Sequence, residues 1–261
     1  MVDCKPCAAP ISLKLHISSD FSLPYPKSSL YRSLTITRPE LSYAVNQACQ
    51  HMHSPTIAHF STVKLILRYV KGTLHFGLQF HPSQFHLHAH SDSNWAGDST
   101  DRRSTSGYCV YLGTNLISWS SKKQATISRS STKTEYRSLA HTAAELSWLQ
   151  MLLIEFSILH STSSTLSCDN LSSMSLATNP VFHSRSKHIE VDCHFVHERV
   201  ASNKLLLKYV PSADQVADVF TNPSLLLGFP FSLTSSWFLQ LPLACGGMIG
   251  SSSYYVGVHH I

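Results

Sequence analysis

Four acidic residues stand in local settings that favour metal binding, although more than a hundred residues separate the first from the last. They are Asp92, Glu135, Asp169 and Asp218. If the chain folds these carboxylates onto one site, they could hold two divalent cations that activate a water molecule and stabilise the leaving oxygen of a phosphodiester. The four residues therefore predict a metal-dependent nuclease.

Each of these acids also has a simpler explanation. Glu135 follows Thr132 with the T-x-x-E spacing of a capping box, in which it would bond back to the start of its own helix. Asp169 closes the strand-like segment TLSCD, where a turn or a helix N-cap equally favours Asp. For Asp218, in QVADVF, an exposed surface acid is the default. The residues alone leave these alternatives open.

Hydrophobic periodicity defines the elements that would have to position the acids. Alternating apolar residues at 78–80, 85–89, 108–112 and 116–119 predict short antiparallel strands. Residues 132–156 predict a long helix that carries Glu135 at the N-terminal end of an apolar stripe. Strands are expected at 165–168 and 205–210, and helices at 40–53, 56–71, 188–201 and 213–221.

The sequence around the acids resembles a known family. The segments SDSNWAGDSTDRRSTSGYCVYLGTNLISWSSKKQATISRSSTKTEYRSLA (91–140), LSCDN (166–170), NPVFHSRSKHIEVDCHFVHERV (179–200) and YVPSADQVADVFT (209–221) carry the match. They resemble the ribonuclease H domain at the end of copia-type retrotransposon Pol polyproteins. Upstream, YRSLTITRPELSYAVNQACQHMHSP and KLILRYVKGT resemble the end of the reverse transcriptase that precedes it.

The resemblance implies an α/β, ribonuclease H-like fold, with a mixed five-stranded sheet, flanking helices and a short helical segment before it. It divides the chain into a reverse transcriptase remnant at 1–84, the ribonuclease H-like domain at 85–221 and a divergent, uncharged and poorly ordered tail at 222–261. It makes Asp92, Glu135, Asp169 and Asp218 the catalytic, metal-binding residues for two Mg²⁺ ions, with Mn²⁺ as a substitute. The implied reaction is cleavage of the RNA strand of an RNA:DNA hybrid.

Two details qualify that correspondence. Lys133 stands where relatives of this type usually carry a second acid, and His188 and Asp192 also match the family, where we expect a structural role on the connecting helix. The order of the four acids, D then E then D then D, argues against an integrase, which typically places its glutamate last.

A basic segment begins after the first acidic motif and ends just past Glu135. Seven Lys or Arg residues occur from Arg102 to Arg137 against a single acid, Glu135. Such a segment could follow a phosphate backbone and recognise a hybrid by its groove shape, and a solvated basic face is the alternative. Our candidate nucleic-acid-binding residues are Lys122, Lys123, Arg129 and Asn170.

Composition constrains the setting of the protein. Seven cysteines, an odd number without a secretory signal, predict reduced thiols in the cytoplasm or nucleus rather than secretion. The pair Cys4 and Cys7 is a lone CxxC and weak evidence for zinc. Residues 225–245 are apolar, but prolines interrupt them and no basic flank follows, so we do not expect a membrane span.

Two hypotheses follow from the sequence. Intact acids favour an active ribonuclease H. A shortened join at YRSLTITRPE and the absence of Asp, Glu, Lys and Arg from 219–261 favour the hypothesis of a catalytically inactive relic that retains the fold and could bind nucleic acid.

Overall fold

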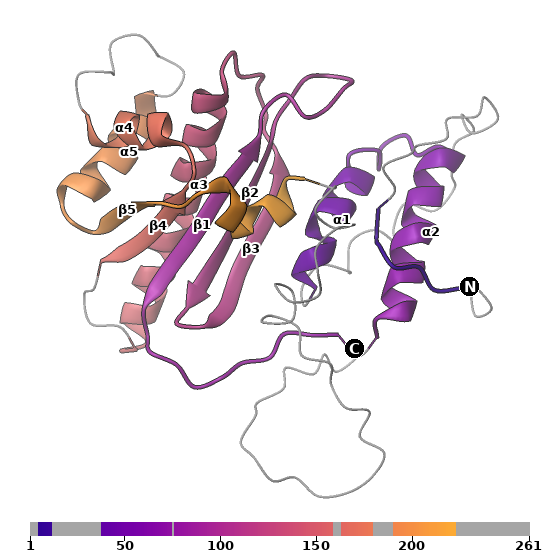
Figure 1. Cartoon of the computed structure of the whole chain (residues 1–261), viewed down its shortest axis with the longest axis horizontal. Helices are drawn as coiled ribbons and strands as arrows, with labels where there is room; N and C mark the ends of the chain where they lie inside the picture. Colours follow the sequence, from indigo (N-terminus) through magenta and orange to yellow (C-terminus); the bar gives the residue numbers. More distant parts are fainter. Residues whose placement is uncertain (1–4, 12–37, 75, 159–162, 180–189, 223–261) are drawn as a thin grey trace, which may run out of the picture. The chain divides into compact units, whose positions relative to one another are not determined.

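The computed structural model describes residues 5–11, 38–74, 76–158, 163–179 and 190–222 (Figure 1). These residues belong to two compact units. One unit is Ser83–Thr221, and the described residues up to Pro82, together with Asn222, belong to the other. Each unit has its own hydrophobic core.

The first unit is a helical pair. A 3-10 turn, η3 (Pro39–Leu41), leads into α1 (Ser42–Cys49), and α2 (Ile57–Gly72) follows. Thr56 begins α2 with a capping box, because its hydroxyl accepts from the His59 amide while the His59 ring accepts from the Thr56 amide. Apolar residues of both helices form the core, and the helices predicted at 40–53 and 56–71 are confirmed.

The second unit is built on a five-stranded sheet. Its strands are β1 (Leu87–Asn94), β2 (Thr105–Leu112), β3 (Asn115–Lys123), β4 (Ser164–Cys168) and β5 (Leu205–Tyr209), in the spatial order β3-β2-β1-β4-β5. The first three strands are antiparallel, as expected for hairpin connections. β4 lies parallel to β1, and β5 lies parallel to β4.

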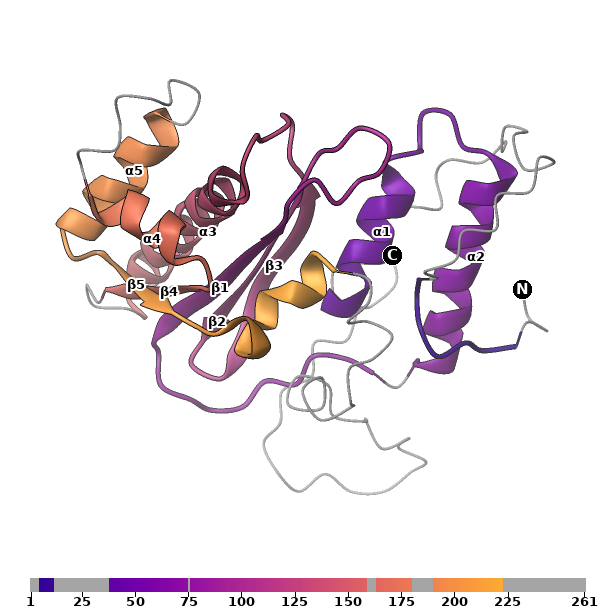
Figure 2. The same ribbon diagram turned by 45° about the horizontal axis from the view of Figure 1, so that its top comes forward.

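Helices cover one face of this sheet. The longest, α3 (Ser131–Glu155), packs its apolar stripe against Leu87 and Ala89 of β1, while α4 (Leu171–Thr178) and α5 (Glu190–Ala201) extend the same layer. Leu139, Ala143 and Leu146 of that stripe are all buried. Each large apolar side chain buried here contributes roughly 1.5–3 kcal/mol relative to an exposed one. Figure 2 shows the three helices on the same side of the strands.

Two short 3-10 turns, η5 (Ser212–Asp214) and η6 (Val216–Phe220), lie on the opposite face. Close approach of η6 to β2 depends on Gly107. A Cβ atom at this position would lie 2.7 Å from the Cβ of Phe220 and 2.7 Å from the Cγ2 of Thr221. The absence of a side chain at Gly107 therefore lets the end of the domain pack flat on the sheet.

The mixed five-stranded sheet and its flanking helices confirm the predicted α/β architecture. Two local predictions were wrong. Residues 78–80 form no strand, and Pro82, which lacks an N–H, stands between them and β1. The helix expected at 213–221 is two 3-10 turns, because Gln215 between them has extended backbone angles.

Some predictions fall outside the described residues. These concern Cys4 of the CxxC pair, His188 and the apolar segment 225–245. Within the described parts of the chain, no helix combines the length and apolar character that crossing a membrane requires. The assignment of 1–84 to a reverse transcriptase remnant and of 222–261 to a divergent tail stays a prediction.

Candidate metal centre

Asp92 and Asp169 lie at the same level of two adjacent parallel strands. In the register of β1 and β4, His90 pairs with Ser167. Asp92 and Asp169 each follow two residues later, Asp92 within β1 and Asp169 just beyond the C-terminal end of β4. The carboxyl ends of parallel strands are where α/β proteins gather their functional groups. The topology therefore accounts for this pair of acids directly.

Glu135 reaches the same place from the first turns of α3. The capping-box explanation for this residue was wrong: the N-cap of α3 is Ser130, whose hydroxyl accepts from the Lys133 amide at 3.4 Å. Glu135 instead accepts a hydrogen bond from the backbone of Ser93 in β1. Its side chain is buried, with 7% of its surface exposed.

The side chain of Glu135 lies close to the end of β4. One carboxylate oxygen of Glu135, one of Asp169 and the Sγ of Cys168 all lie within 4.8 Å of one another. Asp169 also accepts a hydrogen bond from the Ser212 hydroxyl at 2.7 Å, which ties it to η5. The acids predicted to meet from α3 and β4 thus do meet.

Asp218 completes the group from η6. A hydrogen bond joins its carboxyl to that of Asp92, and the charges of Asp92 and Asp169 both act on it. Asp92 also accepts a hydrogen bond from the hydroxyl of Thr221. The structure therefore brings together all four of the predicted acids, from β1, α3, the end of β4 and η6.

Crowding and burial make these carboxylates hard to ionise. Burial, followed by the neighbouring charges of Asp92 and Asp169, raises the pKa of Glu135 to about 9. The same causes raise the pKa of Asp218 to about 8. Burial also raises the pKa of Asp92, against the lowering effect of the Thr221 hydrogen bond. Without a cation, burial and mutual repulsion favour the protonated forms of Glu135 and Asp218, and a bound cation would favour their charged forms.

The donor set fits a hard divalent cation. Oε2 of Glu135 is buried and has no hydrogen-bond partner, which is costly unless another group binds it. Carboxylate oxygens are the ligands that Mg²⁺ prefers. Cys168 is a poor ligand for such an ion, because burial raises its pKa to about 12 and its sulfur accepts from the Asn170 amide.

The four candidate nucleic-acid-binding residues differ in their surroundings. Lys122 and Arg129 are exposed. Lys123 lies 2.6 Å from Asp98 and 2.9 Å from Asp101, so it pairs with carboxylates of the loop after β1. Asn170 is the N-cap of α4, where its side chain accepts from the Ser173 amide at 2.9 Å. Direct contact with nucleic acid stays a prediction for each of them.

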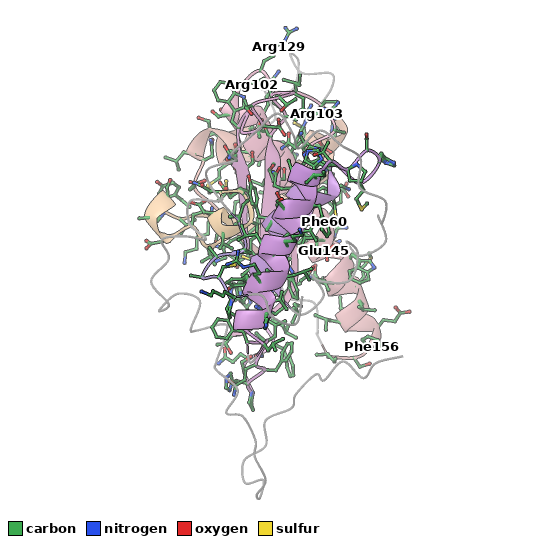
Figure 3. All side chains as sticks on the ribbon, turned by 90° about the vertical axis from the view of Figure 1, so that its right-hand side faces the viewer. Phe60, Arg102, Arg103, Arg129, Glu145 and Phe156 are labelled. Atoms are coloured by element: carbon green, nitrogen blue, oxygen red, sulfur yellow. The ribbon has the colours of Figure 1, made fainter. Side chains whose placement is uncertain are left out.

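One exposed group that was not selected from the sequence follows the strand that carries Asp92. Trp95 follows β1, is 50% exposed, and donates from its ring nitrogen to the Ser128 carbonyl at 3.0 Å. Figure 3 shows Arg102, Arg103 and Arg129 toward one end of the view, and Phe156, just after α3, toward the other. The sequence does contain one signal for this residue, a tryptophan within the same SDSNWAGD motif as Asp92.

The chain is similar in sequence to polyproteins of mobile elements. It is 44% identical over 259 residues to the retrovirus-related Pol polyprotein from transposon RE2 of Arabidopsis thaliana, a match that covers 95% of this chain. It is 45% identical over 233 residues, or 85% of the chain, to that from transposon RE1 of the same plant. The chain spans only 18% and 16% of the length of these relatives. No family model matches it.

The crystal structure of LC11 ribonuclease H1 in complex with an RNA/DNA hybrid is 14% identical to this chain, with a TM-score of 0.38. The match covers 52% of this chain and 94% of that one.

Proposed function

This chain is similar over most of its length to Pol polyproteins of retrotransposons, and on that premise we propose a function for Ser83–Thr221. We propose that this unit is a metal-dependent endonuclease of the ribonuclease H type that cleaves the RNA strand of RNA:DNA hybrids. One observation carries the proposal: four carboxylates from four separate elements meet at one end of a ribonuclease H-like sheet.

The proposed chemistry divides between the chain and the metal. When bound, two Mg²⁺ ions, or Mn²⁺ in their place, would supply a deprotonated water and charge stabilisation at the leaving 3′ oxygen. The chain's own part is to hold the ions. Asp92, Glu135, Asp169 and Asp218 provide the carboxylate oxygens, and burial of Glu135 excludes water from one side of the group.

The surface around the acids supports a nucleic-acid substrate. Lys122 and Arg129 are exposed, and cationic groups that contact phosphates supply affinity that does not depend on sequence. Recognition of a hybrid would then come from the width of its groove and its 2′-hydroxyl groups. Similarity to retrotransposon Pol polyproteins supports an RNA:DNA hybrid over duplex DNA as the substrate.

The proposal is tested by cleavage of labelled hybrid, duplex DNA and duplex RNA by the full chain at increasing magnesium concentrations. Asp92→Asn and Asp169→Asn should lose turnover while their melting temperatures stay near that of the wild type, because an amide keeps the size of the side chain and removes its charge. Asp214→Asn is the matched control: it makes the same chemical change at an exposed acid in η5 and should cleave normally.

Two outcomes would argue against the proposal. Equal cleavage by the wild type and Asp92→Asn would refute the mechanism. A folded wild type that cleaves no substrate at any magnesium or manganese concentration would identify the protein as an inactive relic. Calcium should bind without supporting rapid cleavage, because its looser coordination positions water poorly.

A further inference from the structure

A buried hydroxyl contacts the candidate metal centre at the very end of the domain. Thr221 has 1% of its surface exposed, and its hydroxyl donates to Oδ2 of Asp92, 129 residues away in sequence. The same hydroxyl oxygen lies 3.2 Å from the carbonyl oxygen of Asp218. Thr221 therefore lies against two of the four acids, although it is not an acid itself.

The segment that carries Thr221 is fixed to three strands of the sheet. Gln215 donates to the Ser91 carbonyl of β1 at 3.0 Å, and Asn94 at the end of β1 donates to the Thr221 carbonyl at 3.3 Å. From β3, the Ser121 hydroxyl donates to the Phe220 carbonyl at 2.6 Å. With Gly107 of β2 beneath it, the segment has a defined position, so the Thr221 hydroxyl is held at a fixed point.

A fixed donor at this point has a specific effect on Asp92. The last torsion of an aspartate side chain is broad and roughly two-fold, so the backbone of β1 does not determine how its carboxylate is rotated. A hydrogen bond to Oδ2 favours one rotation of this carboxylate, together with its hydrogen bonds to the Ser93 backbone and to the Asp218 carboxyl. Partners of this kind orient metal ligands, and their loss typically costs about 10- to 100-fold in metal affinity or activity.

We propose that Thr221 is a positioning residue for the metal centre, which sets the orientation of the Asp92 carboxylate for a divalent cation. This inference rests on the proposed function, since it assumes that the four acids bind metal. It adds a role for the end of the domain: η6 and Thr221 deliver both a carboxylate, from Asp218, and the hydroxyl that orients a second carboxylate.

The experiment compares the full-length wild type with Thr221→Val, Thr221→Ser and Ser121→Ala. The valine variant keeps the branched shape and removes the hydroxyl, and the serine variant keeps the hydroxyl. Ser121→Ala removes a hydrogen bond to the same segment that does not involve a carboxylate. The readout is the rise in melting temperature with magnesium, because a ligand that binds only the folded state stabilises it. Cleavage of labelled hybrid is measured in parallel.

We expect Thr221→Val to need about 10- to 100-fold more magnesium than the wild type for the same rise in melting temperature. Thr221→Ser should restore the wild-type response, and Ser121→Ala should lower the melting temperature without changing the magnesium requirement. In cleavage, excess magnesium should recover part of the activity of the valine variant.

Failure of this inference is distinguishable from failure of the proposed function. A wild type that responds to magnesium, together with a valine variant that responds equally, would overturn the role of Thr221 and leave the nuclease proposal intact. An equal increase in the magnesium requirement of Ser121→Ala would also overturn it, because any loosening of the segment would then suffice. A wild type with no response to magnesium or manganese would overturn both.

Discussion

The ammonium group of Lys123, at the end of β3, lies 2.6 Å from a carboxylate oxygen of Asp98. Asp98 belongs to the loop between β1 and β2, so the Lys123 side chain contacts that loop. A second carboxylate oxygen, from Asp101, lies 2.9 Å away. Partial burial acts to raise the pKa of Asp98. The hydrogen bonds from Lys123 and from the amides of Thr100 and Asp101 outweigh this effect, so the pKa of Asp98 is lowered. Lys123 therefore connects the end of β3 to the loop that follows Asp92.

Replacing Lys123 should affect stability more than nucleic-acid binding. Lys123→Ala is expected to lower the free energy of unfolding by about 0.5–1 kcal/mol, the range for a partly exposed ion pair. The loss should shrink at high salt, because ions screen such pairs. Denaturant unfolding at low and high salt measures it. A variant with normal stability and a large loss of hybrid affinity would instead favour direct contact with phosphate.

Lys122, the exposed neighbour, should show the opposite behaviour. In an Asp169→Asn background, which should prevent cleavage, Lys122→Ala is expected to weaken hybrid binding and to lower the slope of log affinity against log salt by about 1. Its stability should not change, because the residue is exposed. Lys204→Ala is the control, since this exposed lysine lies just before β5, at the opposite end of that strand from the acids. Equal losses in both variants would exclude a specific role for Lys122.

The metal-free domain should become less stable as pH rises. The folded-state pKa of Glu135 is about 9 against an ordinary value of 4.5, so the folded protein binds an additional proton between these values. Stability from this group is fully present below pH 4.5 and is lost as pH rises through the folded pKa, at up to about 1.4 kcal/mol per pH unit for one proton. Asp218, with a pKa of about 8, acts in the same direction.

Melting temperatures measured in a chelator across this pH range test the prediction. Glu135→Gln should reduce the pH dependence, since an amide does not ionise, and magnesium should reduce it in the wild type by stabilising the charged carboxylates. Glu198→Gln, at an exposed acid on α5, provides the control and should keep the wild-type slope. A metal-free wild type whose stability is constant or rises over this range would show that the acids are not crowded in solution.

Gly107 should tolerate no side chain. In Gly107→Ala the new Cβ would lie 2.7 Å from Phe220 and Thr221, so η6 would have to move away from β2. We expect a loss of about 1–3 kcal/mol in unfolding free energy, together with an increased magnesium requirement because Thr221 and Asp218 shift. Gly77→Ala adds the same methyl group where no atom lies within 4 Å, and its effect should stay within about 0.5 kcal/mol. Similar stabilities for the two variants would contradict the close packing.

The acids and the long helix were predictable because local sequence determines them. The three- and four-residue spacing from Glu135 to Leu153 fixes which side of α3 is buried, and the apolar run before Asp169 fixes the end of β4. The family resemblance added what local patterns leave open, namely that Glu135 joins the site rather than capping its helix.

The contacts that orient the acids could not be predicted in the same way. The Thr221 hydroxyl and Asp92 are far apart in the chain, and no periodicity relates them. Lys123 was selected for its charge, but its carboxylate partners become visible only when the loop after β1 folds back on β3. The sequence also gave no sign that the backbone near Gln215 would interrupt the last helix, since the side-chain contact to β1 is a tertiary one.

Because the four acids come from β1, α3, the end of β4 and η6, the proposed metal centre can form only while distant segments of the domain are folded together. Opening any one of these segments would remove a ligand, so bound cation should suppress local fluctuations and make the domain open mainly as a whole. Backbone amides in β1, β4 and η6 that exchange with solvent at different rates in a chelator should then approach a common rate in magnesium.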